Sequence, residues 1–168
     1  MQAPATPVIL NNTLLVALWV LGRLDLLRDL YGEVVIPTAV HGEFLAVDRD
    51  VCDSALASAP WIKVALLPHP QRALAYTGLD EGEAEVLALA EETGGLVAMD
   101  ERKGRRYAKR LGPPLTGTLG ILLLAKQGGL VQSVADALAR LQAADLRVDP
   151  SLAVEALRLA GEEPTTTY

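Results

Sequence analysis

The sequence predicts an α/β fold in which a short parallel sheet is covered by helices on both faces. Two observations lead to this prediction: the apolar runs that read as strands are short and uninterrupted, and helical patterns lie between them. Uninterrupted apolar strands are typical of parallel sheets, because both of their faces are buried. The chain has 168 residues, of which 51% are hydrophobic, enough for one domain with a substantial core. We expect a single domain over residues 1–163 and a flexible tail over residues 164–168.

Residues 7–65 read as three strands separated by helices. In chain order these are strand Pro7–Leu10, helices Leu14–Leu21 and Leu24–Leu30, strand Glu33–Ile36, helices Pro37–Leu45 and Val51–Ser58, and edge strand Trp61–Ala65. The strands are short and rich in branched or aromatic residues. Asn11 and Asn12 favour a helix start directly after the first strand, and Gly22 separates the first two helices. Pro37 suits the first turn of the helix that it opens.

Residues 68–163 read as two further strands and five helices. In chain order these are a loop at Pro68–Pro70, helix Asp80–Thr93, strand Leu96–Met99, helix Arg102–Leu111, strand Leu115–Thr116, helix Thr118–Gln127 with Thr118 as its cap, helix Ser133–Ala143, the segment Leu146–Val148 and helix Ser151–Leu159. Acids fill the first turn of the helix at Asp80, where the helix dipole favours negative charge. Gly94 and Gly95 end that helix, and a pair of prolines ends the next one.

Composition argues against several classes of function. The net charge of −6 argues against a broad footprint on nucleic acid, although six of the 15 Lys and Arg residues lie between Arg102 and Arg110. Only 4% of residues are aromatic, so a stacking platform for bases is not expected. A lone cysteine and two isolated histidines give no support to a disulfide or a zinc site. With no secretory signal and no apolar run near the ~20 residues of a membrane span, we expect a soluble, cytoplasmic protein without a membrane partner.

Four side chains with ligand oxygens fall where strands end or helices begin. Asn11 follows the first strand and Asp100 follows the strand Leu96–Met99, while Glu43 lies on the helix after the second strand. Glu83 shares a helix face with apolar residues one and two turns later, so its side chain is expected to point inward. Ligands of parallel sheets bind beyond the carboxyl ends of the strands, and oxygen ligands suit Mg²⁺ or Mn²⁺. These residues are therefore candidates for a shared metal site.

Each of these side chains also has a purely structural interpretation. Asn11 can act only as a helix cap, and Glu43 can be an ordinary solvated glutamate. Glu83 can serve as a partner of the helix dipole, in which case Glu81 and Glu85 are its solvated neighbours. Asp100 has fewer structural reasons to lie at the end of a buried strand, apart from capping the next helix.

Basic and hydroxyl side chains near Asp100 are candidates for binding a phosphate. Arg102 and Arg105 open the basic helix, and cations beside a metal suit a phosphate substrate. Thr116 and Thr118 flank a glycine at a helix start, where backbone N–H groups can hold an anion. A solvated basic face and simple helix capping are the structural alternatives.

The ordered set of motifs resembles the PIN-domain family, specifically its predicted nucleic-acid-binding branch related to VapC-type toxin ribonucleases. The matching segments span residues 8 to about 130 and are Leu10–Leu18, Gly22–Leu27, Val35–Glu43, Leu79–Glu85, Met99–Arg105 and Thr116–Gly120. The resemblance implies a three-layer α/β/α sandwich and a cluster of acids that binds Mg²⁺ or Mn²⁺ for cleavage of single-stranded RNA. Carried over by position, the metal ligands are Asn11, Glu43, Glu83 and Asp100, with Glu101 as an outer member. Asn11 departs from the family, whose active nucleases usually have aspartate there.

The function implied by this resemblance is a metal-dependent endoribonuclease. The narrower expectation is the toxin of a toxin–antitoxin pair, with a small antitoxin as its partner. Glu43, Glu83 and Asp100 are then the catalytic residues, and Thr13, Arg102, Arg105, Thr116 and Thr118 the substrate-binding ones. Three acids and a neutral asparagine favour one metal ion over two. The resemblance also implies a homodimer. The alternative is a catalytically silent PIN-fold module that binds RNA or a protein. A receiver-type phosphoryl-transfer domain is not expected, because it needs paired acids after the first strand and this sequence has Asn11 and Asn12 there.

Overall fold

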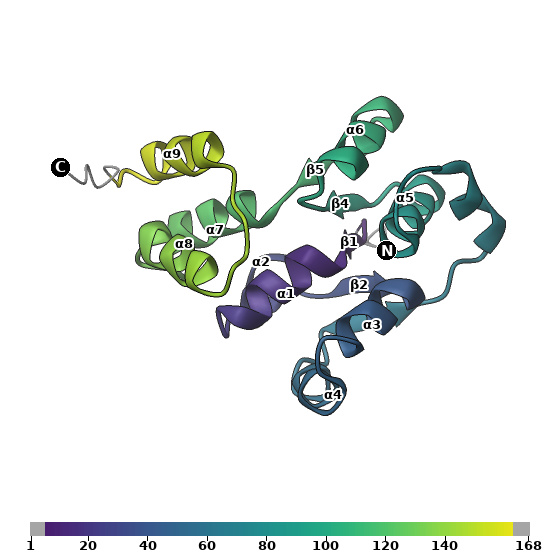
Figure 1. The fold of residues 1–168 in the computed structure, drawn as a ribbon, viewed down its shortest axis with the longest axis horizontal. Coiled ribbons are helices and arrows are strands. Elements are labelled where there is room, and N and C mark those ends of the chain that lie inside the picture. Colours follow the sequence, from purple (N-terminus) through teal and green to yellow (C-terminus); the bar gives the residue numbers. More distant parts are fainter. Residues whose placement is uncertain (1–5, 163–168) are drawn as a thin grey trace, which may run out of the picture.

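A five-stranded sheet forms the centre of the structure, a computed structural model that describes residues 6–162 (Figure 1). Its strands are β1 (Val8–Leu10), β2 (Val34–Pro37), β3 (Ile62–Ala65), β4 (Leu96–Ala98) and β5 (Leu115–Thr116). They lie in the order β3-β2-β1-β4-β5, and every pairing is parallel. The central strand β1 is buried along its whole length, as its uninterrupted apolar sequence predicted. The predicted α/β class with a parallel sheet is therefore confirmed.

Helices cover both faces of this sheet (Figure 1). They are α1 (Asn12–Val20), α2 (Asp25–Tyr31), α3 (Thr38–Leu45), α4 (Arg49–Ala57), α5 (Glu81–Thr93), α6 (Arg102–Leu111), α7 (Thr118–Gln127), α8 (Val134–Ala143) and α9 (Pro150–Leu159), with a 3₁₀ helix η1 (Pro70–Ala75). The sequence predicted every α-helix, but it gave only a loop where η1 begins. Pro70 stands at the first position of η1, where its fixed φ suits a helical turn. The tail predicted at residues 164–168 lies outside the described residues.

Across residues 6–162, none of the helices has both the length and the apolar character needed to span a bilayer.

The path of the chain creates a switch point between β1 and β4. The chain adds β2 and β3 on one side of β1, then returns to place β4 and β5 on the other side. Leu10 at the end of β1 pairs with Ala98 at the end of β4. In parallel sheets, ligands bind beyond the strand ends at such a switch point. Asn11 directly follows Leu10, and Asp100 follows Ala98 by two residues.

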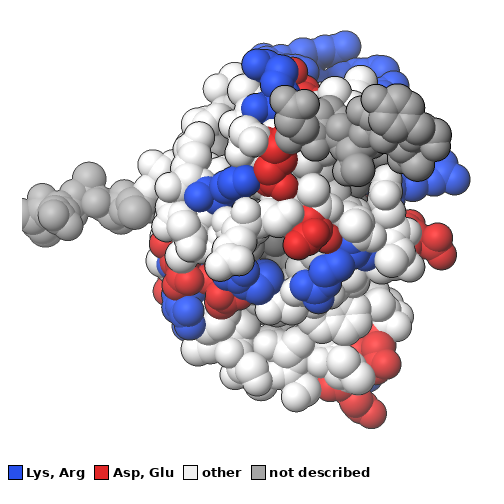
Figure 2. Space-filling model, turned by 90° about the vertical axis from the view of Figure 1, so that its left-hand side faces the viewer, with Lys and Arg blue, Asp and Glu red and all other residues white. Residues whose placement is uncertain are grey.

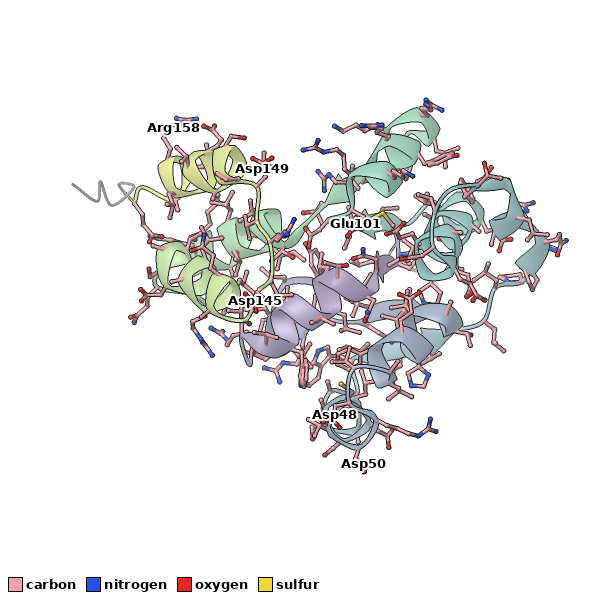
Figure 3. The ribbon with its side chains drawn as sticks, viewed as in Figure 1. Asp48, Asp50, Glu101, Asp145, Asp149 and Arg158 are labelled. Carbon is pink, nitrogen blue, oxygen red and sulfur yellow. The ribbon has the colours of Figure 1, made fainter. Side chains whose placement is uncertain are left out.

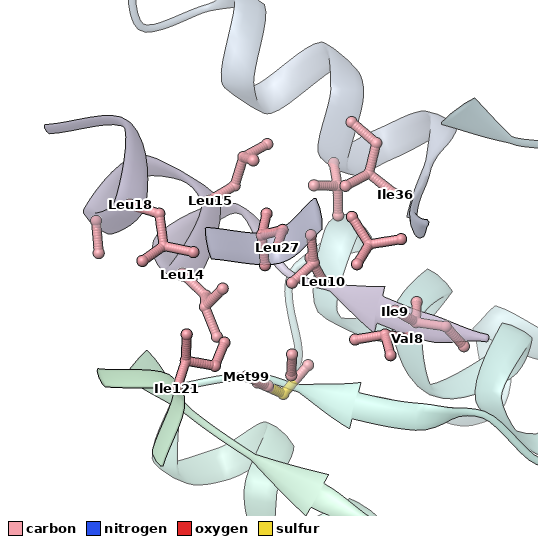
Figure 4. Packing of buried hydrophobic residues seen from close by; sticks show 14 of the residues in the cluster. Val8, Ile9, Leu10, Leu14, Leu15, Leu18, Leu27, Ile36, Met99 and Ile121 are labelled. Atoms are coloured by element: carbon pink, nitrogen blue, oxygen red, sulfur yellow. The ribbon is translucent and has the colours of Figure 1, made fainter. Parts of the chain in front are cut away.

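The hydrophobic core fixes this switch point in place (Figure 4). Ile9, Leu10, Leu14, Met99 and Ile121 are fully buried where β1, α1, α7 and the end of β4 meet. Burial of one such side chain contributes about 1.5–3 kcal/mol to the free energy of folding. Packing therefore sets the positions of the strand ends from which the candidate site is built.

Helix α6 lies very close to the end of β4. A Cβ atom at Gly104 would overlap the sulfur of Met99, so glycine allows α6 to pack there. Ala108, one turn later in α6, is also fully buried. Small residues on one face of α6 thus bring the basic helix against the strand that precedes Asp100.

Candidate active site

Asn11 joins the end of β1 to the start of α1. Its backbone N–H donates to the Ala98 carbonyl of β4 at 3.1 Å, and its side-chain Oδ1 accepts from the Leu14 N–H at 3.2 Å. The residue is 2% exposed and is the N-cap of α1. An amide oxygen has two lone pairs, so one remains for another partner. The capping role is therefore present, and a metal role for Asn11 stays a prediction. The side-chain oxygen of the adjacent Asn12 is buried and lacks a hydrogen-bond partner within the described residues.

Asp100 binds the first residue of α7 with both carboxylate oxygens. Oδ1 accepts from the Thr118 N–H at 2.8 Å, and Oδ2 accepts from the Thr118 hydroxyl at 2.5 Å. A Cβ atom at Gly117 would lie 2.7 Å from Asp100 Oδ1, so this approach requires glycine. The prediction that Thr118 caps α7 is wrong: Gly117 is at the N-cap position, and Thr118 is the buried partner of Asp100.

Glu43 and Glu83 approach each other from α3 and α5. Glu83 is 9% exposed in the first turn of α5, which agrees with the inward direction predicted from its helical spacing. The Glu43 carboxylate lies against Gly82, where a Cβ atom would overlap it. Asp80 caps α5 by accepting the Glu83 N–H at 2.8 Å. Glycine at position 82 thus lets a carboxylate of α3 sit at the N-terminus of α5.

The electrostatics of these acids indicate a concentration of negative charge. Burial, followed by the charges of Asp80, Glu101 and Glu43, raises the pKa of Glu83 to about 7. Burial also raises the pKa of Glu43, followed by the charge of Asp80, while the Gly82 backbone opposes the increase. Glu101 therefore lies close enough to act on Glu83, although it was predicted only as an outer member (Figure 3).

The carboxylate oxygens of these acids are chemically suitable ligands for a divalent cation such as Mg²⁺. Within residues 6–162, none of Glu43, Glu83, Asp100 and Glu101 forms a salt bridge. The same residues contain no group of three or more Asp, Glu, His or Cys side chains arranged as a ready-made metal site. Mg²⁺ usually keeps several waters and takes only one or two carboxylates. A site with few direct protein ligands is therefore compatible with this arrangement.

A family model described as a PIN domain matches residues 7–162. The chain belongs to the PIN-domain family. The match includes α8 and α9, so these helices are part of the PIN domain and extend the resemblance seen in residues 8–130. No curated protein shows significant similarity to the chain.

The PIN domain has a pocket of about 400 Å³ next to Asp100. Asp100, Thr13, Thr118, Arg102 and Arg105 all line it, so most predicted substrate-binding residues meet there. Thr116 is not part of its lining. The backbone carbonyl of Thr116 instead accepts from the Met99 N–H at 3.0 Å, which ties β5 to β4.

The two arginines predicted to bind phosphate differ in their surroundings. Arg105 Nη1 donates to the carbonyls of Met99 at 2.8 Å and Thr116 at 3.1 Å, so it holds the ends of β4 and β5 together. The Arg102 side chain is 79% exposed and forms a 3.6 Å ion pair with Asp149 at the start of α9. Asp149 is labelled in Figure 3. Arg102 is therefore more available to a ligand of the PIN domain than Arg105.

Sequence reasoning missed several residues of this region. Glu85 was expected to be solvated, but its carboxylate accepts the Ala39 N–H at 3.1 Å at the start of α3. Arg106, Lys109 and Arg147 line the pocket, and Arg147 comes from the segment Leu146–Val148, where the sequence indicated no functional residue. The cluster of basic residues in α6 was a signal for the first two. No local pattern around Arg147 indicates that it faces α6.

Proposed function

We propose that this PIN domain is a metal-dependent endoribonuclease that hydrolyses phosphodiester bonds of single-stranded RNA with Mg²⁺ or Mn²⁺. The observation that carries the proposal is the buried acid Glu83, whose pKa is raised to about 7 and which has no cationic partner in the described part of the chain. Such a group costs stability and is typical of functional sites. It lies in a PIN domain, a fold associated with nucleases.

Each candidate residue has a role in this proposal. Glu43 and Glu83 would hold the metal from the helices, and Asn11 and Asp100 would complete its ligands from the strand ends. A bound divalent cation supplies Lewis-acid chemistry, because it lowers the pKa of water and offsets charge on the phosphate. Without a bound cation the pKa of Glu83 is about 7, and a cation held by its carboxylate would favour the charged form. Thr118 holds the Asp100 carboxylate in a fixed orientation.

A cleavage assay tests this proposal. Fluorescently labelled single-stranded RNA is incubated with the protein and Mn²⁺, with EDTA as the metal-free condition. We expect Glu83→Gln and Asp100→Asn to lower the cleavage rate on the order of 100-fold or more, because each removes a ligand charge. Glu33→Gln is the matched control, since Glu33 is exposed and directly precedes β2, at the amino ends of the strands rather than at the carboxyl ends that carry the candidate site. Equal cleavage by the wild type and Glu83→Gln would contradict the proposal.

A second candidate function is a silent module that binds RNA or a protein without cleaving it. Two observations favour it: Asn11 is neutral and already engaged as a helix cap, and the described residues contain no ready-made metal site. Binding of RNA that is insensitive to Mn²⁺, together with no cleavage, identifies this alternative in the same assay.

The resemblance to toxin ribonucleases supports a narrower proposal. The enzyme is then the toxin of a toxin–antitoxin pair, acts as a homodimer, and is inhibited by a small antitoxin. Growth arrest on expression, relieved by Glu83→Gln and by co-expression of a small neighbouring open reading frame, tests this narrower role.

A further inference from the structure

The pocket beside Asp100 has two facing walls. One wall is α6, and the other is the connection between α8 and α9 together with the first turn of α9. Its volume of about 400 Å³ is within the ~300–1,000 Å³ typical of small-molecule sites. Because Asp100 is part of its lining, the pocket continues directly from the candidate active site.

The rim of this pocket is basic although the protein carries a net charge of −6. Arg102, Arg106 and Lys109 follow each other at helical spacing on one face of α6, and Arg147 comes from the opposite wall. Within residues 6–162, only Arg102 of these four has an ion-pair partner. Figure 2 views the molecule from the side on which α9 lies in Figure 1, and it shows basic side chains gathered along the top. In Figure 1, α6 and α9 also lie in the upper part of the molecule. The rim therefore favours an anionic ligand.

The interior of the pocket is apolar. Leu119 and Leu141 belong to the helices behind it, and Leu146, Val148 and Leu152 belong to the outer wall. Leu152 is 58% exposed, so this apolar surface is open to a ligand. An inorganic anion would leave the aliphatic lining unused. The lining and the rim together suit a ligand that carries both a flat ring with apolar faces and a phosphate, as a nucleotide does.

We propose that this pocket is a nucleotide subsite that holds the RNA residue adjacent to the cleaved phosphodiester. Aliphatic side chains bury its base, and the cations of α6 together with Arg147 bind its flanking phosphates. The subsite rests on the proposed ribonuclease function. RNA is favoured over an acidic peptide because a strand that presents a phosphodiester to Asp100 must continue into a neighbouring space, and Asp100 itself lines this pocket.

RNA binding without metal tests the subsite separately from cleavage. Fluorescence anisotropy measures the Kd of the full chain for a labelled single-stranded decamer in EDTA over a series of salt concentrations. We expect the double variant Arg106→Ala/Arg147→Ala to weaken binding ~10-fold or more, and to lower the slope of log K against log salt by about 1.4, as for two lost phosphate contacts. Leu152→Asp places a negative charge in the exposed apolar wall and should weaken binding as well.

The control is Arg49→Ala/Lys63→Ala, which removes two exposed cations from α4 and β3 and should leave the Kd unchanged. Circular dichroism melts confirm that all variants fold. If the pocket variants bind as tightly as the wild type while the wild type cleaves RNA, the subsite is wrong and the nuclease stands. Pocket-dependent binding without cleavage supports nucleotide binding in this pocket, but it contradicts the nuclease and with it the position of the subsite beside a cleaved phosphodiester. No RNA binding at low salt, with a glutamate-rich peptide binding instead, overturns the subsite.

Discussion

Glu83 is buried in the first turn of α5, where its own burial and the charges of Asp80, Glu101 and Glu43 raise its pKa. The folded protein therefore holds an acid where a neutral side chain of the same shape would be more stable. The exposed Asp80 already caps the helix, so capping gives no reason for a buried acid at position 83. Such a local cost is expected where function requires a charge.

The pKa of Glu83 predicts how its removal changes stability. The folded pKa of about 7 lies above the ordinary value of 4.5, so the folded state binds more protons and loses stability as pH rises between these values. Glu83→Gln should therefore raise the free energy of unfolding at pH 8 by about 1–3 kcal/mol, and leave it nearly unchanged at pH 4. Urea unfolding in EDTA at both pH values measures this. A less stable variant at pH 8 would show that Glu83 has a structural role.

At the scale of whole elements, the C-terminal helices are joined by one carboxylate. Glu162, just after α9, accepts the N–H groups of Val134 at 2.7 Å and Ala135 at 3.1 Å at the start of α8. It also accepts from the Ser133 hydroxyl at 3.0 Å and the Lys126 ammonium of α7 at 2.8 Å. Glu162 thus connects three helices, including the one whose first turn forms the outer wall of the pocket.

Glu162 predicts the opposite dependence on pH. Burial alone would raise its pKa, but Lys126, the Ala135 and Val134 N–H groups and Ser133 lower it to about 2. A lowered folded pKa stabilises the fold above pH 4.5, and this contribution is lost as pH falls toward 2. Glu162→Gln should lower the free energy of unfolding by about 1–3 kcal/mol at pH 7 and by clearly less at pH 3. The same urea experiments measure it, and an equal loss at both pH values would contradict the ionic role.

Strands and helices could be predicted because their signals are local. The apolar run of β1 is long enough to mark a strand buried on both faces, and Asp80 marks the start of α5. The inward direction of Glu83 followed from the spacing of its apolar neighbours. Asn11 and Asp100 became candidate site residues because ligands of parallel sheets bind beyond the carboxyl ends of the strands.

The partners of individual side chains could not be predicted in this way. Thr118 resembles an ordinary helix cap in sequence, and only the packing of α7 against β4 places its hydroxyl on Asp100. Glu85 has the sequence of a solvated residue, yet the position of α3 gives it a backbone donor. Arg147 faces α6 only because α8 and α9 fold back over α7, and no spacing in the sequence records that path.

At the scale of the whole molecule, the proposed metal site requires side chains from four separate segments of the chain to act on one cation. Three acids and a neutral asparagine carry a charge of −3, one less than a site with four acids. Asn11 and aspartate are equally good helix caps, so Asn11→Asp retains the bond to the Leu14 N–H. The new charge also lies at the N-terminus of α1, where the helix dipole favours it.

Asn11→Asp should therefore tighten Mn²⁺ binding without loss of the fold. One added charge at close range predicts a Kd lower by about 10-fold, which corresponds to 1.4 kcal/mol. A ligand that binds only the folded state raises the melting temperature. The increase in melting temperature caused by Mn²⁺ should therefore be larger in Asn11→Asp than in the wild type, and smaller in Glu83→Gln. Gln132→Glu, an exposed change of equal charge between α7 and α8, is the control. A calorimetric titration in which Asn11→Asp binds Mn²⁺ no more tightly than the wild type would mean that position 11 does not contact the metal, and that its asparagine serves only the helix.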